Sequence, residues 1–180
     1  MPKTVQNTKQ QIPTDADRPL PELRSYIAGE LVTPTVDRGN MLLNPNDLQP
    51  MQAQLSCSEE QVETALAAAE KAYRDETCEN TPAAERATVI EAIAEALEAP
   101  EERERIAHAD AITTGAVINV TRKMAQLAPF VFRNAAQYLR SGKMEQQLPG
   151  KLGEVEYFRR PWGPALLVSP WNGPTAIGSH

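Results

Sequence analysis

The middle of the chain carries apolar residues at helical spacing. From Ser58 onward they recur every three or four positions, which predicts a helix with one apolar face. Ser58 and Gln61 fit a capping box, in which two side chains bond backbone N–H groups of the first turn, and we expect the helix to end near Asp75. The apolar stripe consists of Val62, Ala65, Leu66, Ala69, Ala72 and Tyr73.

Two further helices are predicted between residues 81 and 115. The first of them has Thr81 as its cap and Pro82 in its first position, with one apolar and one acidic face. The next begins at Pro100 and ends at Gly115, because glycine accepts the left-handed conformation that closes a helix. The apolar face of the first comprises Val89, Ile90, Ile93 and Leu97.

A fourth helix is predicted from Ile118 to Leu139, ending at Ser141-Gly142. Pro129 lies inside it and has no backbone N–H, so we expect a bend there. Residues 58–140 are therefore expected to be mostly helical.

Two short hairpins are predicted before the helices. Ala28-Gly29 separates one pair of short apolar segments, and the turn formers Asn44 to Asp47 separate another. Proline fixes φ and asparagine tolerates positive φ, so the second set suits a tight turn. The paired segments are Tyr26-Ile27 with Leu31-Val32, and Met41–Leu43 with Met51–Leu55.

The final forty residues change in character. Lys143 to Gln147 and Glu154 to Arg159 alternate around Pro149-Gly150, as two strands of an exposed ribbon would. The continuous apolar run Ala165–Val168 then suits a strand buried on both faces of a parallel sheet. A loop follows, in which Pro174 is placed to begin a helix.

The predicted strand Ala165–Val168 lacks neighbours in the sequence. A parallel strand pairs with others reached through connections of a dozen or more residues, and only twelve residues follow this one. Alone it would expose an unpaired apolar edge, which favours aggregation. We therefore expect the sequence to be an incomplete part of a larger fold.

Composition and charge exclude several functions. A formal charge of −6 argues against a general affinity for nucleic acid or anionic lipid, and the sequence has neither a membrane-span-length apolar stretch nor a secretory signal. Cys57 and Cys78 stand in no metal-binding or CxxC spacing, with no histidine near either, so we expect reduced structural thiols in a cytoplasmic protein. Arg159 and Arg160 point to opposite faces of a strand, which favours structural use over phosphate binding.

The segment around the predicted strand resembles the first cofactor-domain strand of the aldehyde dehydrogenase superfamily. The resemblance is carried by Arg160-Pro161-Trp162-Gly163-Pro164 before the strand and by Ser169-Pro170-Trp171-Asn172-Gly173-Pro174 after it. The upstream order is also similar, from the Tyr-Ile-Ala-Gly hairpin through the Asn-Pro turn and the Glu-Glu-Gln-Val-Glu-Thr-Ala-Leu helix. The resemblance covers roughly residues 25–180 and implies the N-terminal part of an α/β fold with a doubly wound cofactor sheet.

This resemblance implies oxidation of an aldehyde by a cysteine thiolate, with hydride transfer to NAD or NADP and hydrolysis of a thioester assisted by a glutamate. Asn172 matches the family's side-chain donor to the oxyanion, a catalytic role that a fixed amide N–H₂ can fill. Positions matching those that line the nicotinamide half of the cofactor are Val168, Ser169, Pro170, Trp171 and Asn172. The family's glycine-rich loop, ribose-contacting residues, catalytic glutamate and nucleophilic cysteine match nothing in residues 1–180.

The resemblance divides the chain into four parts. Residues 1–21 are polar and rich in proline, and we expect a mobile arm. Residues 22–142 would hold the hairpins and helical layer, residues 143–160 a ribbon for homo-oligomerisation, and residues 161–180 the first strand and loop of the dinucleotide-binding sheet. No metal is expected.

Three functions stay open at this stage. The leading hypothesis is the N-terminal portion of an NAD(P)-dependent aldehyde dehydrogenase that is inactive alone, for want of a nucleophile and a general base. The alternative is a non-catalytic oligomerisation module that pairs with a full-length or complementary subunit through residues 143–160. A third, an unrelated four-helix binding protein, requires the Pro-Trp-Asn segment to be accidental.

Overall fold

The computed structural model describes residues 20–179, so most of the predicted arm lies outside the described residues. Both predicted hairpins are confirmed. Strands β1 (Ser25–Ile27) and β2 (Glu30–Val32) pair antiparallel, and Ala28 and Gly29 both take positive φ in the turn between them. Strands β3 (Val36–Leu43) and β4 (Pro50–Ser56) form the second hairpin, with Asn44 accepting a bond from the Asn46 amide in the turn.

Helix α1 (Glu59–Arg74) begins and ends as predicted. The Gln61 amide donates to Ser58 Oγ at 3.2 Å, and the Ser58 amide donates to Gln61 Oε1 at 3.0 Å, which is the capping box. Gln61 Nε2 also donates to the Thr33 carbonyl at 2.9 Å, so the cap ties the helix to the chain after β2. Asp75 ends the helix.

Helix α3 (Ala83–Glu98) is capped by Pro82, and the prediction of Thr81 as its cap is wrong. The Thr81 hydroxyl instead donates to the Thr77 carbonyl at 2.6 Å and closes the short helix α2 (Thr77–Asn80), which the sequence pattern did not predict. Because that hydroxyl bonds a residue that precedes it in the chain, it does not bond the first turn of α3.

Helix α4 (Pro100–Thr114) ends at Gly115, whose φ is +76°, as predicted. The single bent helix predicted after it is two helices, α5 (Ile118–Met124) and α6 (Leu127–Arg140). Proline in a helix interior removes a backbone bond, whereas the first turn has N–H groups without helical partners. Beginning α6 at Leu127 places Pro129 in that first turn.

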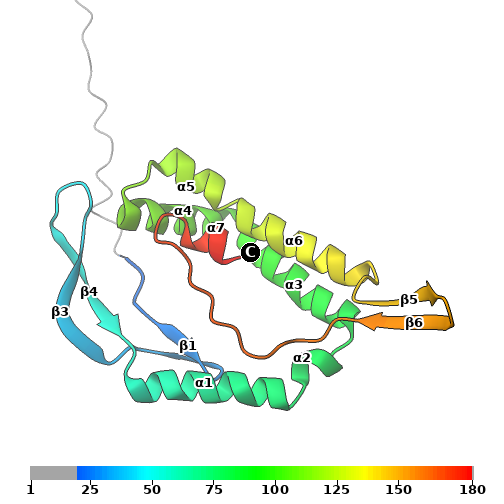
Figure 1. The fold of residues 1–180 in the computed structure, drawn as a ribbon. Coiled ribbons are helices and arrows are strands. Elements are labelled where there is room, and N and C mark those ends of the chain that lie inside the picture. Colours follow the sequence, from blue (N-terminus) through cyan, green and yellow to red (C-terminus); the bar gives the residue numbers. More distant parts are fainter. Residues whose placement is uncertain (1–19, 180) are drawn as a thin grey trace, which may run out of the picture.

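Helices α3 and α6 pack side by side (Figure 1). Ala87 and Ala94 of α3 and Ala136 of α6 are fully buried, and these small side chains let the two backbones approach closely. Glu91 and Glu98 share the face of α3 that carries the buried alanines, by helical spacing. The acidic face was expected to lie away from the packed one, but part of it faces α6.

Two arginines of α6 bind those glutamates. Arg140 donates to both carboxylate oxygens of Glu91, at 3.0 and 2.6 Å, and Arg133 donates to both oxygens of Glu98. These hydrogen bonds lower the pKa of Glu91 and of Glu98. The pair of helices is thus joined by buried alanines and by two bidentate ion pairs at its border.

Strands β5 (Glu145–Gly150) and β6 (Gly153–Phe158) form the predicted ribbon, which projects away from the helices (Figure 1). Every residue of both strands is exposed. The Arg159 amide donates to the Met144 carbonyl at 3.0 Å, which continues the pairing toward the base of the ribbon.

The apolar run Ala165–Val168 is not a strand in this structure, contrary to prediction. The three sheets of the described residues are two-stranded hairpins, so none offers this run a parallel neighbour. Leu166 is 90% exposed and Val168 83%. The segment crosses the open middle of the molecule and leads into helix α7 (Pro174–Gly178), which begins with Pro174 as predicted (Figure 1).

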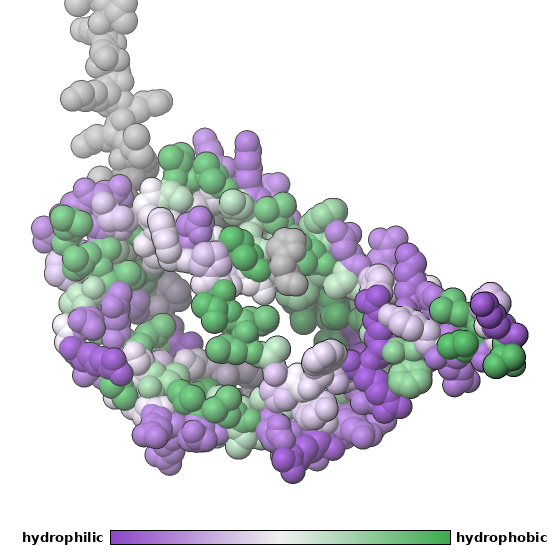
Figure 2. All heavy atoms as spheres, in the orientation of Figure 1, coloured by the Kyte–Doolittle hydropathy of each residue, from purple (hydrophilic) through white to green (hydrophobic). Residues whose placement is uncertain are grey.

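The molecule is an open frame with little core. The buried hydrophobic residues are alanines and Ile27, and no large side chain among residues 20–179 is fully buried. Figure 2 shows openings on both sides of the segment that crosses the middle, with apolar residues around them.

Candidate functional site

All five predicted site residues lie in the irregular segment between β6 and α7. Val168, Ser169, Pro170, Trp171 and Asn172 are all exposed, and Trp171 is 74% exposed. They are consecutive residues on one short loop, so the structure brings them together as a single surface. None of the five lines either of the two cavities described below.

Helix α7 fixes the end of this loop. Gly173 is buried and caps the helix, and the Ile177 amide donates to its carbonyl at 3.0 Å. Ser169 folds back on the helix, since its Oγ lies 2.7 Å from where a Cβ on Gly178 would stand. The helix in turn contacts α6. The loop is thereby tied at one end to the helical layer.

The Asn172 side chain is exposed and bears two N–H donors. Within residues 20–179, no hydrogen bond holds its amide. An exposed amide of this kind can donate to a carbonyl oxygen or oxyanion brought to it, but its donation becomes strong only where water is excluded. The described residues supply the hydrogen-bond donor but not the surrounding walls that would exclude water from it.

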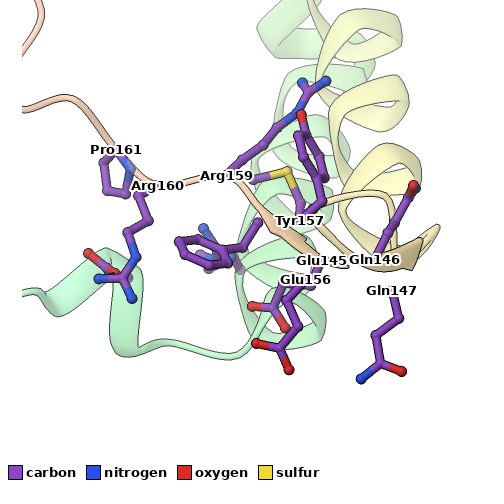
Figure 3. Close-up of a pocket in the computed structure, with 12 residues that line it drawn as sticks. Glu145, Gln146, Gln147, Glu156, Tyr157, Arg159, Arg160 and Pro161 are labelled. Carbon is purple, nitrogen blue, oxygen red and sulfur yellow. Dashed lines mark hydrogen bonds and ion pairs between the residues drawn. The ribbon is translucent and has the colours of Figure 1, made fainter. Parts of the chain in front are cut away.

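A polar groove of about 470 Å³ lies elsewhere, between the base of the ribbon and helices α2 and α3. Arg159 Nε donates to the Tyr157 hydroxyl at 2.8 Å, and Arg160 pairs with Glu79 at 2.8 Å. Figure 3 shows Arg159 and Arg160 pointing to opposite sides of the chain, as the alternation of a strand predicts. The bond to Tyr157, with the nearby phenols, raises the pKa of Arg159.

An apolar cavity of about 740 Å³ lies between α1, α2, α3 and the residues that follow the ribbon. Sequence reasoning missed it, because its walls come from segments that are far apart in the chain. Arg86 lines both this cavity and the polar groove, whereas Asn172 lines neither.

Both cysteines are free and neither lies on the Asn172 loop. Cys57 precedes α1, and its Sγ lies 3.4 Å from Ser25 Oγ. Cys78 lies in α2 and lines the apolar cavity. The sequence pattern does not predict this helix, because four residues are too few to show helical periodicity.

Residues 20–179 contain neither a metal-binding cluster nor a membrane-spanning helix. No group of three or more His, Cys, Asp or Glu residues there could hold a metal ion. None of the helices in this part of the chain is long and apolar enough to cross a membrane.

Comparison with known proteins shows which family the loop and the residues before it match. The model of the aldehyde dehydrogenase family matches residues 34–180. Among solved structures, HpcC from Thermus thermophilus has a TM-score of 0.74 at 27% identity, over 90% of this chain and 30% of that one. An NAD-dependent benzaldehyde dehydrogenase from Corynebacterium glutamicum has a TM-score of 0.59 at 28% identity, over 71% and 27% of the two chains.

A double mutant of betaine aldehyde dehydrogenase from Staphylococcus aureus, solved with NAD⁺, has a TM-score of 0.73 at 21% identity. That match covers 89% of this chain and 32% of that one and shows the fold alone. No curated protein matches the sequence. The chain spans about a third of the length of the solved structures it matches, and the expected fold, the N-terminal part of theirs, is confirmed.

Proposed function

The chain belongs to the aldehyde dehydrogenase family, and from this premise we propose that it supplies part of an enzyme that oxidises aldehydes to carboxylic acids with NAD or NADP. The observation that carries the proposal is the extent of the family match, which runs through the Pro170-Trp171-Asn172 loop to residue 180. That loop is exposed and tied to α7, as one wall of a site would be before the other walls are added.

In this proposal Asn172 stabilises the oxyanion. Attack of a thiolate on the aldehyde carbon moves an electron pair onto the carbonyl oxygen, and the Asn172 amide donates a hydrogen bond to it. A donor of this kind contributes about 2.7–4 kcal/mol in a water-poor site. The exposed amide, unbonded within residues 20–179, is available for this role.

The nicotinamide half of NAD or NADP would lie along Val168, Ser169, Pro170, Trp171 and Asn172. The cofactor accepts the hydride when it is bound. The residues fit one side of a flat ring, because Trp171 offers an exposed apolar wall and Val168 an exposed apolar edge. The NAD-dependent benzaldehyde dehydrogenase from Corynebacterium glutamicum, which is 28% identical to the chain over the matched part, supports the same cofactor class.

The nucleophile and the general base would come from residues other than these 180. Cys57 lies before α1, beside Ser25, and Cys78 lies in α2, where it lines the apolar cavity. Both cysteines are far from the Asn172 loop in sequence. We propose that residues 1–180 alone do not catalyse the reaction.

The exposed ribbon suggests how the protein associates. We propose that residues 143–160 join subunits of a homo-oligomer, because every residue of β5 and β6 is exposed and both strands have a free edge. The same observation favours the second candidate, a non-catalytic module that pairs with a complementary subunit. The two free cysteines are compatible with a cytoplasmic location.

The first test is an assay of purified residues 1–180 with short and long aliphatic and aromatic aldehydes and either NAD⁺ or NADP⁺. We expect no enzyme-dependent formation of NADH or NADPH. Sustained formation by this chain alone would show that the nucleophile lies within it and would overturn the division of the site.

The second test begins with sequencing of the transcript through the codon for His180. If the open frame continues, the longer product should oxidise an aldehyde, and Asn172→Ala should lower kcat by about 10²–10³-fold. Asn134→Ala, at an exposed position of α6, is the matched control and should leave kcat unchanged. If a stop codon follows, co-purification of residues 1–180 with a larger dehydrogenase subunit would favour the interaction module.

A further inference from the structure

The apolar cavity has walls from five parts of this chain. They are α1, α2, α3, α6 and the segment 161–164, and the apolar lining includes Tyr73, Val89, Ile90, Leu139, Pro161 and Pro164. Its volume of about 740 Å³ falls in the range of about 300–1,000 Å³ that is usual for sites of small molecules. None of residues 168–172 lines the cavity, so the inference does not depend on the role proposed for Asn172.

Arg86 lines the cavity and has a buried nitrogen without a hydrogen-bond partner in the described part of the chain. It lies in the first turn of α3, its Nε is buried, and this atom has no hydrogen-bond partner among residues 20–179. No ion pair to Arg86 is present in this part of the chain. Burying an arginine nitrogen without an acceptor is unfavourable, so the site is one that an anion would stabilise.

Other arginines of the helical layer differ from Arg86 in this respect. Arg133 and Arg140 of α6 each hold a glutamate of α3 with two hydrogen bonds, and Arg160 pairs with Glu79. These three arginines therefore each have a carboxylate partner, whereas Arg86 has none among the described residues.

Two carboxylates also line the cavity, and both have partners. Glu79 is bound by Arg160 at 2.8 Å, and Glu76 accepts a bond from Asn80 Nδ2 at 3.4 Å. Of the charged groups there, Arg86 is the one whose nitrogen is buried without an acceptor. Charge complementarity thus favours an anionic occupant over a cationic one.

Arg86 also stands where two chemically different spaces meet. Glu79, Arg86 and Pro161 line both the polar groove and the apolar cavity. A molecule that places its charged end at Arg86 can therefore extend an apolar chain between Tyr73, Ile90 and Pro164 while its head stays near the polar side.

We propose that this cavity binds a medium-chain aliphatic carboxylate. The carboxylate accepts hydrogen bonds from the Arg86 guanidinium, whose planar donors match two carboxylate oxygens, and the alkyl chain fills the apolar walls. Inorganic phosphate would satisfy the arginine but leave the apolar walls in water. An aliphatic alcohol would fill the walls but leave the arginine without an anion.

Cys78 provides the readout, because it is exposed and lines the cavity, while Cys57 lies elsewhere. The rate of alkylation by iodoacetamide is measured at both cysteines by mass spectrometry, on the whole 180-residue chain, with decanoate below its micelle concentration. Decanoate should slow alkylation of Cys78 several-fold and leave that of Cys57 unchanged. Decanol should protect Cys78 with an affinity lower by about 10-fold, because a hydrogen bond to a charged group is lost.

Variants distinguish the contribution of Arg86 to the affinity from that of the apolar walls. Arg86→Met should lower the affinity for decanoate to that for decanol, and Arg86→Lys should give an intermediate affinity. Arg38→Met, at an exposed position of β3, makes the same change in charge and should have no effect. Circular dichroism checks that each variant keeps its helices.

The comparison of decanoate with decanol in the unchanged chain decides the proposal even if Arg86→Met fails to fold. Equal protection by the two compounds would mean an apolar cavity without a carboxylate site. Absence of protection by either, or a decanoate preference that survives in a folded Arg86→Met, would equally overturn it.

Discussion

The α3–α6 pair and the segment Ala165–Val168 both carry apolar residues. The helix pair buries apolar side chains between its helices, whereas the side chains of the segment are exposed to solvent. In the helix pair, Ala87, Ala94 and Ala136 are fully buried against one another's helices. In the segment, Leu166, Leu167 and Val168 are all more than three-quarters exposed.

The difference follows from where each element finds its partners. A helix closes its own backbone hydrogen bonds, so α3 and α6 need only side-chain contacts, through alanines and ion pairs, to pack together. A strand needs a second strand to accept its backbone bonds, and no hairpin in the described chain supplies one beside Ala165–Val168. The α3–α6 contact is therefore made within this chain, whereas the run Ala165–Val168 has no backbone partner among the described residues.

The largest effect is expected from overfilling the helix pair. Ala94→Leu adds a branched side chain at a fully buried position and should reduce the free energy of unfolding by about 1–3 kcal/mol. Urea unfolding followed by circular dichroism measures it. Ala92→Leu, at an exposed position of the same helix, is the control, and an equal loss in both variants would mean that α3 does not pack as described.

The ion pairs should contribute a smaller, pH-dependent effect. Hydrogen bonds from Arg140 and Arg133 lower the pKa of Glu91 and of Glu98 below 4.5 in the folded state. Their contribution to stability is thus full above the unfolded-state pKa and is lost as pH falls through the lower, folded-state pKa.

The double variant Glu91→Gln, Glu98→Gln tests this contribution. It should be less stable than the parent at pH 7, and the two should converge in acid, because the parent loses its pairs there. Urea midpoints across this pH range measure the difference. Glu63→Gln, on the exposed face of α1, should follow the parent, and a parent-variant gap that persists in acid would contradict the account.

A still smaller change is expected at the attachment of the loop. Gly178→Ala places a Cβ 2.7 Å from Ser169 Oγ, so the serine must move. Fluorescence of the nearby Trp171 should shift, with little loss of stability, and Ser169→Ala in the same chain should reverse the shift. Persistence of the shift in the double variant would mean that this contact does not position the loop.

The smallest effect on stability is expected in the bare segment. Leu167→Asp should change the free energy of unfolding by less than about 0.5 kcal/mol, because the side chain has no packing to lose. Sedimentation should show less self-association. Leu139→Asp, at a half-buried position of α6, should by contrast be strongly destabilising, and similar losses for both would remove the distinction between the two regions.

Local rules predicted most of the fold. The capping box at Ser58, the left-handed Gly115 and the turn at Ala28-Gly29 depend on residues near one another in sequence, and all three are present. The errors arose where a residue could be accommodated in more than one way and its neighbours determined which way was adopted. Thr81 was needed by α2, and Pro129 could be accommodated by beginning a new helix at Leu127.

For the candidate site, the sequence could predict which consecutive residues belong to it but not their spatial surroundings. The sequence placed Val168 at the end of a strand and Ser169 to Asn172 in the loop after it. The structure has all five residues in one irregular segment, and the function of Asn172 stays a prediction. Arg86 and its cavity could not be predicted, since Tyr73, Leu139 and Pro164 meet only through the packing of distant segments.

Amide hydrogen exchange on the 180-residue chain, resolved by peptide, tests most directly the claim that α3 and α6 pack within this chain while Ala165–Val168 has no backbone partner. We expect slow exchange across α3 and α6 and exchange of the Leu166, Leu167 and Val168 amides at nearly the rate of an unfolded chain. Slow exchange in Leu166–Val168 would contradict it, because those amides would then have hydrogen-bond partners within this chain.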